Sequence, residues 1–285
     1  MSASIPEALQ AWIKVETAAG SAPEALLHAL RTSGWTDAAA ITVLNATLGG
    51  DFSHLPKVLD EEVEIQDAPL PGPDLAATPF HVDTPDRRVE VLSTVHSPRI
   101  VVFGGLLSGR ECAALIAASR RWIRHSPVVD AERGGGKLTD VRTSEGCAFL
   151  RQHNALVARI EARIAHLLNW PLENGEGLQV LRYGPGGEYQ PHHDYFDPDS
   201  PGSAAELKRG GQRVGTLIMY LQEPERGGAT IFPEIGLEIA PKRGNAVFFN
   251  YSLPHPSTRT LHAGAPVLAG EKWIATKWLR EQTHD

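Results

Sequence analysis

The sequence predicts a mainly β protein with flanking helices, an α+β fold. Its expected core is an antiparallel jelly roll or barrel, preceded by a small N-terminal helical segment. After Leu178 the chain consists of short apolar runs separated by turn residues, namely LQVLRY, EYQPHHDYF, QRVGTLIMYL, ATIFP, LEIA, NAVFFNY, RTLHA and EKWIATKWLR. Residues 1 to about 48 instead carry apolar residues at three- and four-residue spacing with capping signals, which predicts three short helices.

The boundary between these parts is a stretch rich in proline, glycine and acidic residues, from Gly49 to about Thr84. We therefore expect a helical segment with its linker over residues 1–75 and a second domain over residues 76–285. The second domain should begin with two strands, VEVLS and RIVVF, followed by helices over Ser108–Ile123 and about Arg151–Asn169. The N-terminal helices are either a packing appendage or a module that binds a partner.

Composition excludes several classes of partner. The formal net charge is −7 and the basic residues form no dense block, so neither nucleic acid nor an anionic membrane surface is an expected partner. Cys112 and Cys147 show no metal-binding spacing, which favours a reducing compartment and excludes a cysteine zinc site. The N-terminus lacks signal-peptide character and no apolar run has membrane-spanning length, so we expect a cytoplasmic protein.

The segment LRYGPGGEYQPHHDYFD contains the first candidate metal ligands. Successive side chains of a β-strand point to opposite faces, so residues two apart share a face. His192 and Asp194 form such a pair, whereas His193 points away from both. A histidine and an aspartate at this spacing occur by chance in many proteins, and a third ligand must come from elsewhere in the chain.

The third ligand is sought among the histidines that follow the pair, which are His255, His262 and His284. His284 is next to the C-terminus and His255 lies between two prolines, which disfavour strand pairing. His262 lies in RTLHAG, a plausible strand, and is the preferred candidate. Two histidines and one carboxylate leave positions open on a metal, as non-haem Fe(II) oxygenases require, although a zinc hydrolase could use the same residue types.

Lys272 favours the oxygenase. It begins the predicted strand EKWIATKWL, on which Lys272, Ile274 and Thr276 share one face. A lysine that points into a barrel needs an anionic partner, because an unpaired buried ammonium group is very costly. A dicarboxylate cosubstrate would supply that partner. The alternative is a lysine at a strand end that extends its ammonium group into solvent.

The span from Val89 to Arg280, about two-thirds of the chain, resembles the prolyl 4-hydroxylase branch of the Fe(II)/2-oxoglutarate dioxygenases. The resemblance rests on several blocks in the same order, namely VEVLS, DVRTSEGCAFL, LQVLRYGPGGEYQPHHDYFD, GGQRVGTLIMYLQEPERGGATIFP, NAVFFNY and RTLHAGAPVLAGEKWIATKWLRE. It implies a double-stranded β-helix core, Fe(II) as the metal, 2-oxoglutarate and O₂ as cosubstrates, and ascorbate as a reductant. Residues 1 to about 75 lie outside it.

The resemblance also assigns roles to five residues of the expected iron and cosubstrate site. His192, Asp194 and His262 match the iron ligands of the family. Lys272 matches the lysine that pairs with the distal carboxylate of 2-oxoglutarate, and Tyr183 matches the tyrosine that hydrogen-bonds near it.

Three more residues, Tyr189, Arg213 and Trp278, match positions that line the peptide groove. Without the family they could equally be a strand aromatic, a surface charge and core filler. Arg280 departs from the pattern, because some relatives have a groove-lining histidine there. The resemblance implies hydroxylation of a peptidyl proline at C4, with release of succinate and CO₂. The alternatives are a hydroxylase of a free amino acid or other small molecule, and a metal-binding barrel without activity.

Overall fold

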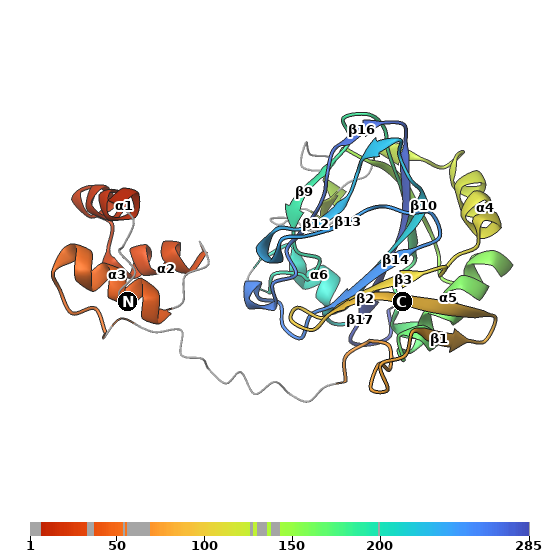
Figure 1. The fold of residues 1–285 in the computed structure, drawn as a ribbon, viewed down its shortest axis with the longest axis horizontal. Helices are drawn as coiled ribbons and strands as arrows, with labels where there is room; N and C mark the ends of the chain where they lie inside the picture. Colours follow the sequence, from red (N-terminus) through yellow and green to blue (C-terminus); the bar gives the residue numbers. More distant parts are fainter. Residues whose placement is uncertain are drawn as a thin grey trace. The chain divides into compact units, whose positions relative to one another are not determined.

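The structure, a computed structural model, describes residues 7–32, 37–53, 55, 69–125, 128–129, 136–137, 143–198 and 200–284. The chain divides into two compact units, Met1–Ala68 and Pro69–Asp285 (Figure 1).

The described residues of the first unit form three helices, as predicted, which are α1 (Glu7–Ala18), α2 (Pro23–Thr32) and α3 (Asp37–Leu48). Leu26, Leu27 and Leu30 follow helical spacing on α2, and all three are buried. They pack with Ile13 of α1 and Leu44 of α3 in a core that belongs to this unit alone. The unit therefore has a hydrophobic core of its own.

The second unit contains a large and a small antiparallel sheet. The nine-stranded sheet has the order β1 (His81–Thr84), β2 (Arg87–Val95), β3 (Ile100–Gly104), β14 (Ala246–Asn250), β10 (Arg213–Gln222), β17 (Lys272–Arg280), β8 (Leu178–Tyr183), β7 (Glu145–Phe149), β4 (Arg124–His125). The four-stranded sheet has the order β13 (Leu237–Ile239), β12 (Thr230–Phe232), β15 (His262–Gly264), β9 (Tyr189–His192). Two short ribbons pair β11 (Arg226–Gly227) with β16 (Val267–Ala269), and β5 (Val128–Val129) with β6 (Gly136–Lys137).

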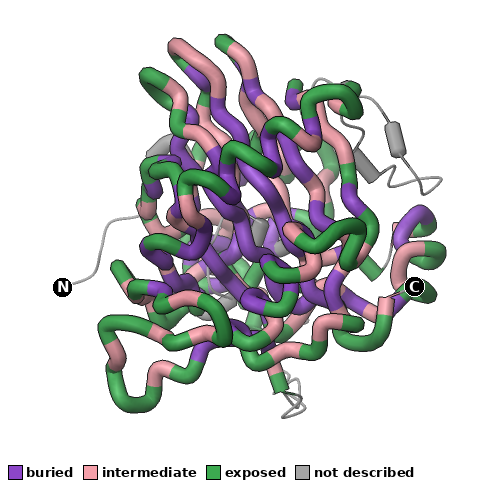
Figure 2. The backbone as a smooth tube through the Cα atoms, turned by 90° about the vertical axis from the view of Figure 1, so that its right-hand side faces the viewer, coloured by how far each residue is buried: buried purple, intermediate pink, exposed green. Residues whose placement is uncertain are grey.

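The large and the small sheet enclose one apolar core, which contains Leu181, Ile218 and Ile274 from the large sheet and Phe232 and Ile239 from the small one. Neighbours in each sheet are often distant in sequence, as for β3 beside β14 and β9 beside β15. This arrangement is the double-stranded β-helix that the sequence predicts. Figure 2 shows that buried residues gather along the middle of the strands, with exposed residues in the turns.

A second core lies between the outer face of the large sheet and two helices, α4 (Gly109–Ser119) and α5 (Ala155–Leu167), which are visible beside that sheet in Figure 1. Ser108 and Glu111 form the capping box that begins α4. Asn154 caps α5 through the N–H groups of its first turn, so this helix begins later than predicted. The shorter helical elements are α6 (Ser203–Leu207), η1 (Leu172–Asn174), η2 (Pro233–Ile235) and η3 (Pro256–Thr258).

Strand β17 contributes to both cores because its side chains alternate. Trp273 and Ala275 pack toward the helices. Lys272, Ile274 and Thr276 line the cavity between the sheets, on the shared face that the sequence predicts. This strand therefore places the buried lysine inside the barrel.

The segment from Pro69 to Leu75, which was expected to be part of the linker, packs onto the second unit. The N–H of Gly72 donates to the carbonyl oxygen of Leu168 over 2.7 Å. The Asn250 side chain donates to the carbonyl oxygen of Pro71, also over 2.7 Å. These seven residues belong structurally to the second unit.

One predicted strand, EYQPHHDYF, is shorter than expected because the chain bends after His192. Beyond the bend, side chains replace the strand ladder as hydrogen-bond partners of the backbone. Gln212 accepts from the N–H of Phe196 and donates to its carbonyl oxygen, each over 2.8 Å. Arg213 donates to the carbonyl oxygen of Asp194 over 3.2 Å. Within the described residues, no helix combines the length and apolar character needed to cross a membrane.

Candidate active site

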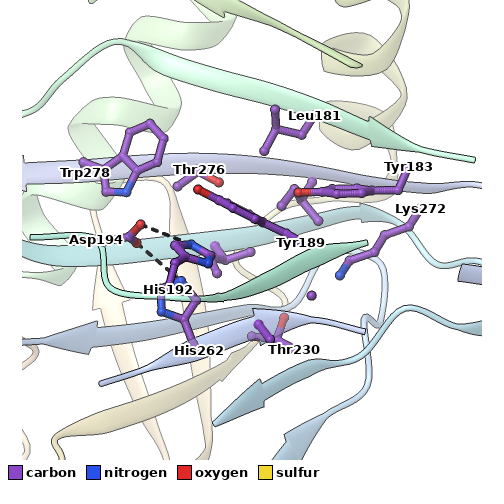
Figure 3. A pocket seen from close by; sticks show the side chains of 14 residues that line it. Leu181, Tyr183, Tyr189, His192, Asp194, Thr230, His262, Lys272, Thr276 and Trp278 are labelled. Carbon is purple, nitrogen blue, oxygen red and sulfur yellow. Dashed lines mark ion pairs between the residues drawn. The ribbon is translucent and has the colours of Figure 1, made fainter. Parts of the chain in front are cut away.

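Three side chains with metal-binding atoms converge at one end of the barrel cavity (Figure 3). His192 ends β9 and His262 begins β15, and these two residues are direct partners across the strand pair. Asp194 lies in the bend after β9, with Oδ1 3.6 Å from Nε2 of His192 and Oδ2 3.5 Å from Nε2 of His262. One ligand atom from each residue lies within 4.8 Å of the others, a spacing that a single cation can bridge.

Both histidines present the same nitrogen to this centre. Nδ1 of His192 lies 2.8 Å from the carbonyl oxygen of Gln190, and Nδ1 of His262 lies 3.1 Å from that of Thr260. Because a carbonyl oxygen only accepts, each Nδ1 carries the proton and each Nε2 keeps its lone pair. A metal-binding histidine characteristically donates its other N–H to such a partner. The residues present therefore fit a divalent cation.

The charges at this centre also suit a cation. Burial raises the pKa of Asp194, but the adjacent His262 and His192 outweigh it and hold that pKa well below the usual range. Burial, together with the neighbouring His192, lowers the pKa of His262 to about 4. At neutral pH the group therefore contains an ionised carboxylate and a neutral His262 imidazole.

Lys272 lies in the same cavity, with its Nζ pointing inward (Figure 3). Its side chain is only 3% exposed, and among the described residues no hydrogen bond or ion pair engages Nζ. Burial lowers its pKa to about 8. Lys272 is the cross-strand partner of Tyr183, and Nζ lies 5.5 Å from the centre of the Tyr183 ring. An anionic ligand group would compensate this buried charge.

Glycine leaves room beside the lysine. A Cβ atom at Gly228 would meet Cδ of Lys272 at 3.2 Å, and one at Gly264 would lie 3.9 Å from Nζ. Gly228 also has a φ of +74°, which side chains rarely adopt. The two glycines thus keep the space around the ammonium group open.

Two of the three residues expected to bind substrate line the same cavity. Tyr189 stacks on His192 with ring centres 3.6 Å apart, and Trp278 lies at the metal end of the cavity (Figure 3). The indole Nε1 of Trp278 is buried and has no hydrogen-bond partner among the described residues. It is a donor available to a ligand.

Arg213, the third, does not line the cavity but lies directly behind it. Its guanidinium carbon is 4.0 Å from the centre of the Trp278 ring and 4.5 Å from that of Phe196. It donates to both carboxylate oxygens of Glu176, over 2.7 and 2.9 Å, and to the carbonyl oxygen of Asp194. It therefore connects the indole to the backbone of a candidate ligand.

Arg280, where the sequence departs from the family pattern, shares the Glu176 carboxylate. It is fully buried and donates to Oε1 of Glu176 over 3.0 Å. Burial alone would raise the pKa of Glu176, but Arg213 and Arg280 outweigh it and lower that pKa to about 2. Glu176 is therefore the ionised partner of two buried guanidinium groups.

The other candidate histidines lie apart from the metal-binding group. His193 stacks on Tyr195 with ring centres 4.7 Å apart, as expected for a side chain that points away from its neighbours. His255 is exposed and caps η3, where its Nδ1 accepts from the N–H of Ser257. His284 is not part of the group either. The structure thus brings His262, and not His255, next to His192 and Asp194.

Sequence reasoning missed three polar residues around this site. Glu176 and Thr216 contact the candidate ligands or their supports, and Thr230 lines the cavity. Strand alternation could have placed Thr216 on the same face as Ile218, but it does not indicate which face of a strand lies toward the interior of the barrel. Glu176 lies between η1 and β8, outside any strand, where the sequence gives no comparable signal.

The comparisons with known proteins agree with this geometry. Residues 178–280 match the family model of the 2OG-Fe(II) oxygenase superfamily. The chain is 42% identical over 203 residues to prolyl 4-hydroxylase 1 of Arabidopsis thaliana, covering 65% of this chain and 70% of that protein. It is 39% identical over 214 residues to prolyl 4-hydroxylase 5 of the same plant, covering 68% and 71%.

Among solved structures, the viral collagen prolyl hydroxylase of Paramecium bursaria Chlorella virus-1, a 2OG complex, aligns with 33% identity. The alignment covers 64% of this chain and 95% of that one, with a TM-score of 0.49. The extent of sequence identity to the plant enzymes decides the assignment. The chain belongs to the prolyl 4-hydroxylase family of Fe(II)- and 2-oxoglutarate-dependent oxygenases.

Proposed function

We propose that this protein hydroxylates a prolyl residue within a polypeptide, at C4, while 2-oxoglutarate and O₂ are converted to succinate and CO₂. The proposal rests on one cavity that contains both a metal-binding group and a buried positive charge. A group of two histidines and an aspartate lies at one end, and a buried lysine without an anionic partner among the described residues lies in the same cavity. Its relatives include the plant prolyl 4-hydroxylases.

His192, Asp194 and His262 are the proposed iron ligands. Both Nε2 atoms are free because the Nδ1 atoms face backbone carbonyl groups, and the carboxylate is buried and ionised. Three protein ligands leave positions open for a chelating cosubstrate and for O₂. When bound, Fe(II) with 2-oxoglutarate and O₂ supplies the oxidant that converts a C–H bond of the substrate into C–OH.

Lys272 is the proposed partner of the distal carboxylate of 2-oxoglutarate. With a pKa of about 8 the ammonium group is mostly protonated at neutral pH, so it can compensate an incoming negative charge. Tyr183 lies beside it, on the facing residue of β8, and is the proposed hydroxyl partner of the same carboxylate. A monocarboxylic oxo acid would leave the lysine unpaired, which explains a preference for a dicarboxylate.

Trp278 and Tyr189 are the proposed surfaces for the proline ring. Both aromatic rings line the cavity beside the metal-binding group, and an aromatic face suits an apolar ring with a fixed φ. The unpaired Nε1 of Trp278 can donate to a carbonyl oxygen of the substrate. Arg213 does not line the cavity, so its proposed contribution to substrate binding is to hold the Trp278 ring, which its guanidinium contacts 4.0 Å from the ring centre.

We also propose that ascorbate is the reductant and that the protein is cytoplasmic. The N-terminal helices form a unit with its own core, which is compatible with a partner-binding module separate from the chemistry. The functional division that we propose is an N-terminal segment over residues 1–75 and an oxygenase over residues 76–285, with residues 69–75 as structural support for the oxygenase.

The deciding experiment compares substrates. The protein is incubated with Fe(II), 2-oxoglutarate, ascorbate and either proline-rich peptides or free proline and other free amino acids. We expect one oxygen to be added to a peptidyl proline, with an equivalent amount of succinate. Mass spectrometry locates the oxygen, and the Asp194→Ala variant provides the background. Coupled oxidation of a free amino acid without peptide turnover would show that the alternative, a small-molecule hydroxylase, is correct.

A further inference from the structure

Behind the metal-binding group, two buried hydroxyl groups form a chain that ends on Asp194. Thr216 on β10 donates from Oγ1 to Oδ2 of Asp194 over 2.7 Å. The hydroxyl oxygen of Tyr251 lies 3.1 Å from the same Oγ1. Thr216 is 0% exposed and Tyr251 2% exposed, and neither lines the cavity. These two hydroxyl groups can therefore act on a ligand only through Asp194.

The direction of both hydrogen bonds follows from the single proton of the Thr216 hydroxyl. That proton is directed to Oδ2 of Asp194, to which Oγ1 donates. Oγ1 of Thr216 must then accept from Tyr251, whose phenol is the donor. Each donor is thereby matched to one acceptor, and the chain is polarised toward the carboxylate.

The Tyr251 phenol is held independently of Thr216. Its ring contacts Tyr195 edge-on, with centres 6.0 Å apart, and lies 6.3 Å from Phe249. Its backbone N–H donates to the carbonyl oxygen of Val214 over 3.2 Å, immediately after β14. Packing and the backbone thus fix the phenol in place, and the phenol in turn fixes the orientation of the Thr216 hydroxyl.

This arrangement treats the two oxygens of Asp194 differently. Oδ2 accepts a short hydrogen bond from a buried donor, whereas among the described residues no hydroxyl group donates to Oδ1. We propose that Thr216 and Tyr251 are positioning residues that commit Oδ2 to hydrogen bonding and leave Oδ1 as the single carboxylate oxygen for the metal. This inference rests on the proposed iron ligands. Its consequence is a monodentate carboxylate, which keeps a third coordination position open for the cosubstrates.

The test uses Mn(II) alone and three variants of the full-length protein. Thr216→Val removes the donor at nearly constant volume, Thr216→Ser retains it, and Tyr251→Phe removes only the phenolic oxygen. Tyr220→Phe is the matched control. Tyr220 is also fully buried and also donates to a threonine, Thr230, over 2.8 Å, but this pair does not reach Asp194.

Two properties are measured under nitrogen: the affinity for Mn(II), and the water-proton relaxation of the bound ion, which reports its coordinated waters. We expect Thr216→Val to weaken Mn(II) binding about 10- to 100-fold, as for other changes to partners of metal ligands. Its bound ion should also lose about one coordinated water, because the freed Oδ2 becomes a second ligand atom. Thr216→Ser should restore both properties. Tyr251→Phe should weaken binding about fivefold, the effect of one ordinary hydrogen bond.

Several results would overturn the inference. One is wild-type Mn(II) affinity and relaxation in Thr216→Val and Tyr251→Phe, even if their melting temperatures fall, because the hydroxyl chain would then be structural only. An equal loss in Tyr220→Phe would likewise show a general effect of removing a buried hydroxyl group. Tyr251→Phe, which removes one atom, decides the question if Thr216→Val does not fold. If the unaltered protein binds no Mn(II), the proposed metal site itself is wrong and this inference fails with it.

Discussion

Replacing Lys272 with methionine removes the charge inside the cavity while retaining most of the side-chain volume. The lysine is 3% exposed and has no anionic partner among the described residues, so the proposed 2-oxoglutarate carboxylate would be its main counter-charge. A buried hydrogen bond to a charged group contributes about 1.5–3 kcal/mol. At about 1.4 kcal/mol per tenfold change, Lys272→Met should weaken 2-oxoglutarate binding roughly 10- to 100-fold.

The assay is a calorimetric titration under nitrogen with Mn(II) in place of iron, so that binding is measured without turnover. The wild-type protein and Lys272→Met are each titrated with 2-oxoglutarate and with 2-oxobutyrate, which lacks the distal carboxylate. We expect the wild type to favour 2-oxoglutarate strongly and Lys272→Met to distinguish the two acids only weakly. Lys272→Arg should recover part of the preference, because it restores the positive charge.

The pH dependence adds an independent check on the same residue. Because burial lowers the pKa of Lys272 to about 8, 2-oxoglutarate affinity should be constant below about pH 8. It should fall by up to about tenfold per pH unit above it, as the free protein loses the ammonium proton. The reasoning is refuted if Lys272→Met keeps the wild-type preference for 2-oxoglutarate. A wild-type affinity that stays constant to pH 10 would contradict the lowered pKa.

Three further predictions concern the metal group, the buried network and the chain boundary. Asp194→Ala should lose its metal while His193→Ala retains it, as metal analysis of the purified variants will show; equal loss in both would contradict the ligand assignment. Glu176→Ala should lower stability by about 3–5 kcal/mol in urea unfolding, because two buried guanidinium groups lose their counter-ion. Since the Glu176 pKa is lowered to about 2, its contribution should be present above about pH 4.5 and disappear as the pH falls toward 2, whereas a pH-independent loss would refute this role. A chain beginning at Pro69 should still form succinate with a minimal peptide, whereas one beginning at Pro79 should melt earlier because it lacks the contacts of residues 69–75. Inactivity of the longer chain would show that the helices are needed for chemistry.

Local patterns in the sequence were sufficient for much of the fold. The helix that begins after Ser108, the three short N-terminal helices and the β-rich second half all depend on residues close together in the chain. Alternation along a strand correctly grouped Lys272 with Thr276 on the cavity side. Such patterns are informative because the periodicity of side-chain direction is a property of the element itself.

Strand alternation predicted that the His193 side chain would be separate from His192 and Asp194, but of these three residues only His192 lies on β9. Asp194 lies beyond the end of β9, in a bend whose backbone is held by Gln212 and Arg213. It converges with His192 through that bend, and not as a residue of the same strand. The sequence spacing identified the pair, but the side chains that shape the bend come from another part of the chain.

The order of strands in the sheets was decided only by the tertiary structure. Hydrogen bonding between strands does not depend on their distance in sequence, so β14 pairs with β3 and β15 with β9 without any local signal. This order brings Tyr251 behind Thr216, and Glu176 between two buried arginines. The sequence by itself predicted candidate residues for a metal and a dicarboxylate, because residue type and spacing along the chain are local properties. Which buried groups orient those residues depends on contacts between distant segments, and these form only when the sheets close around the cavity.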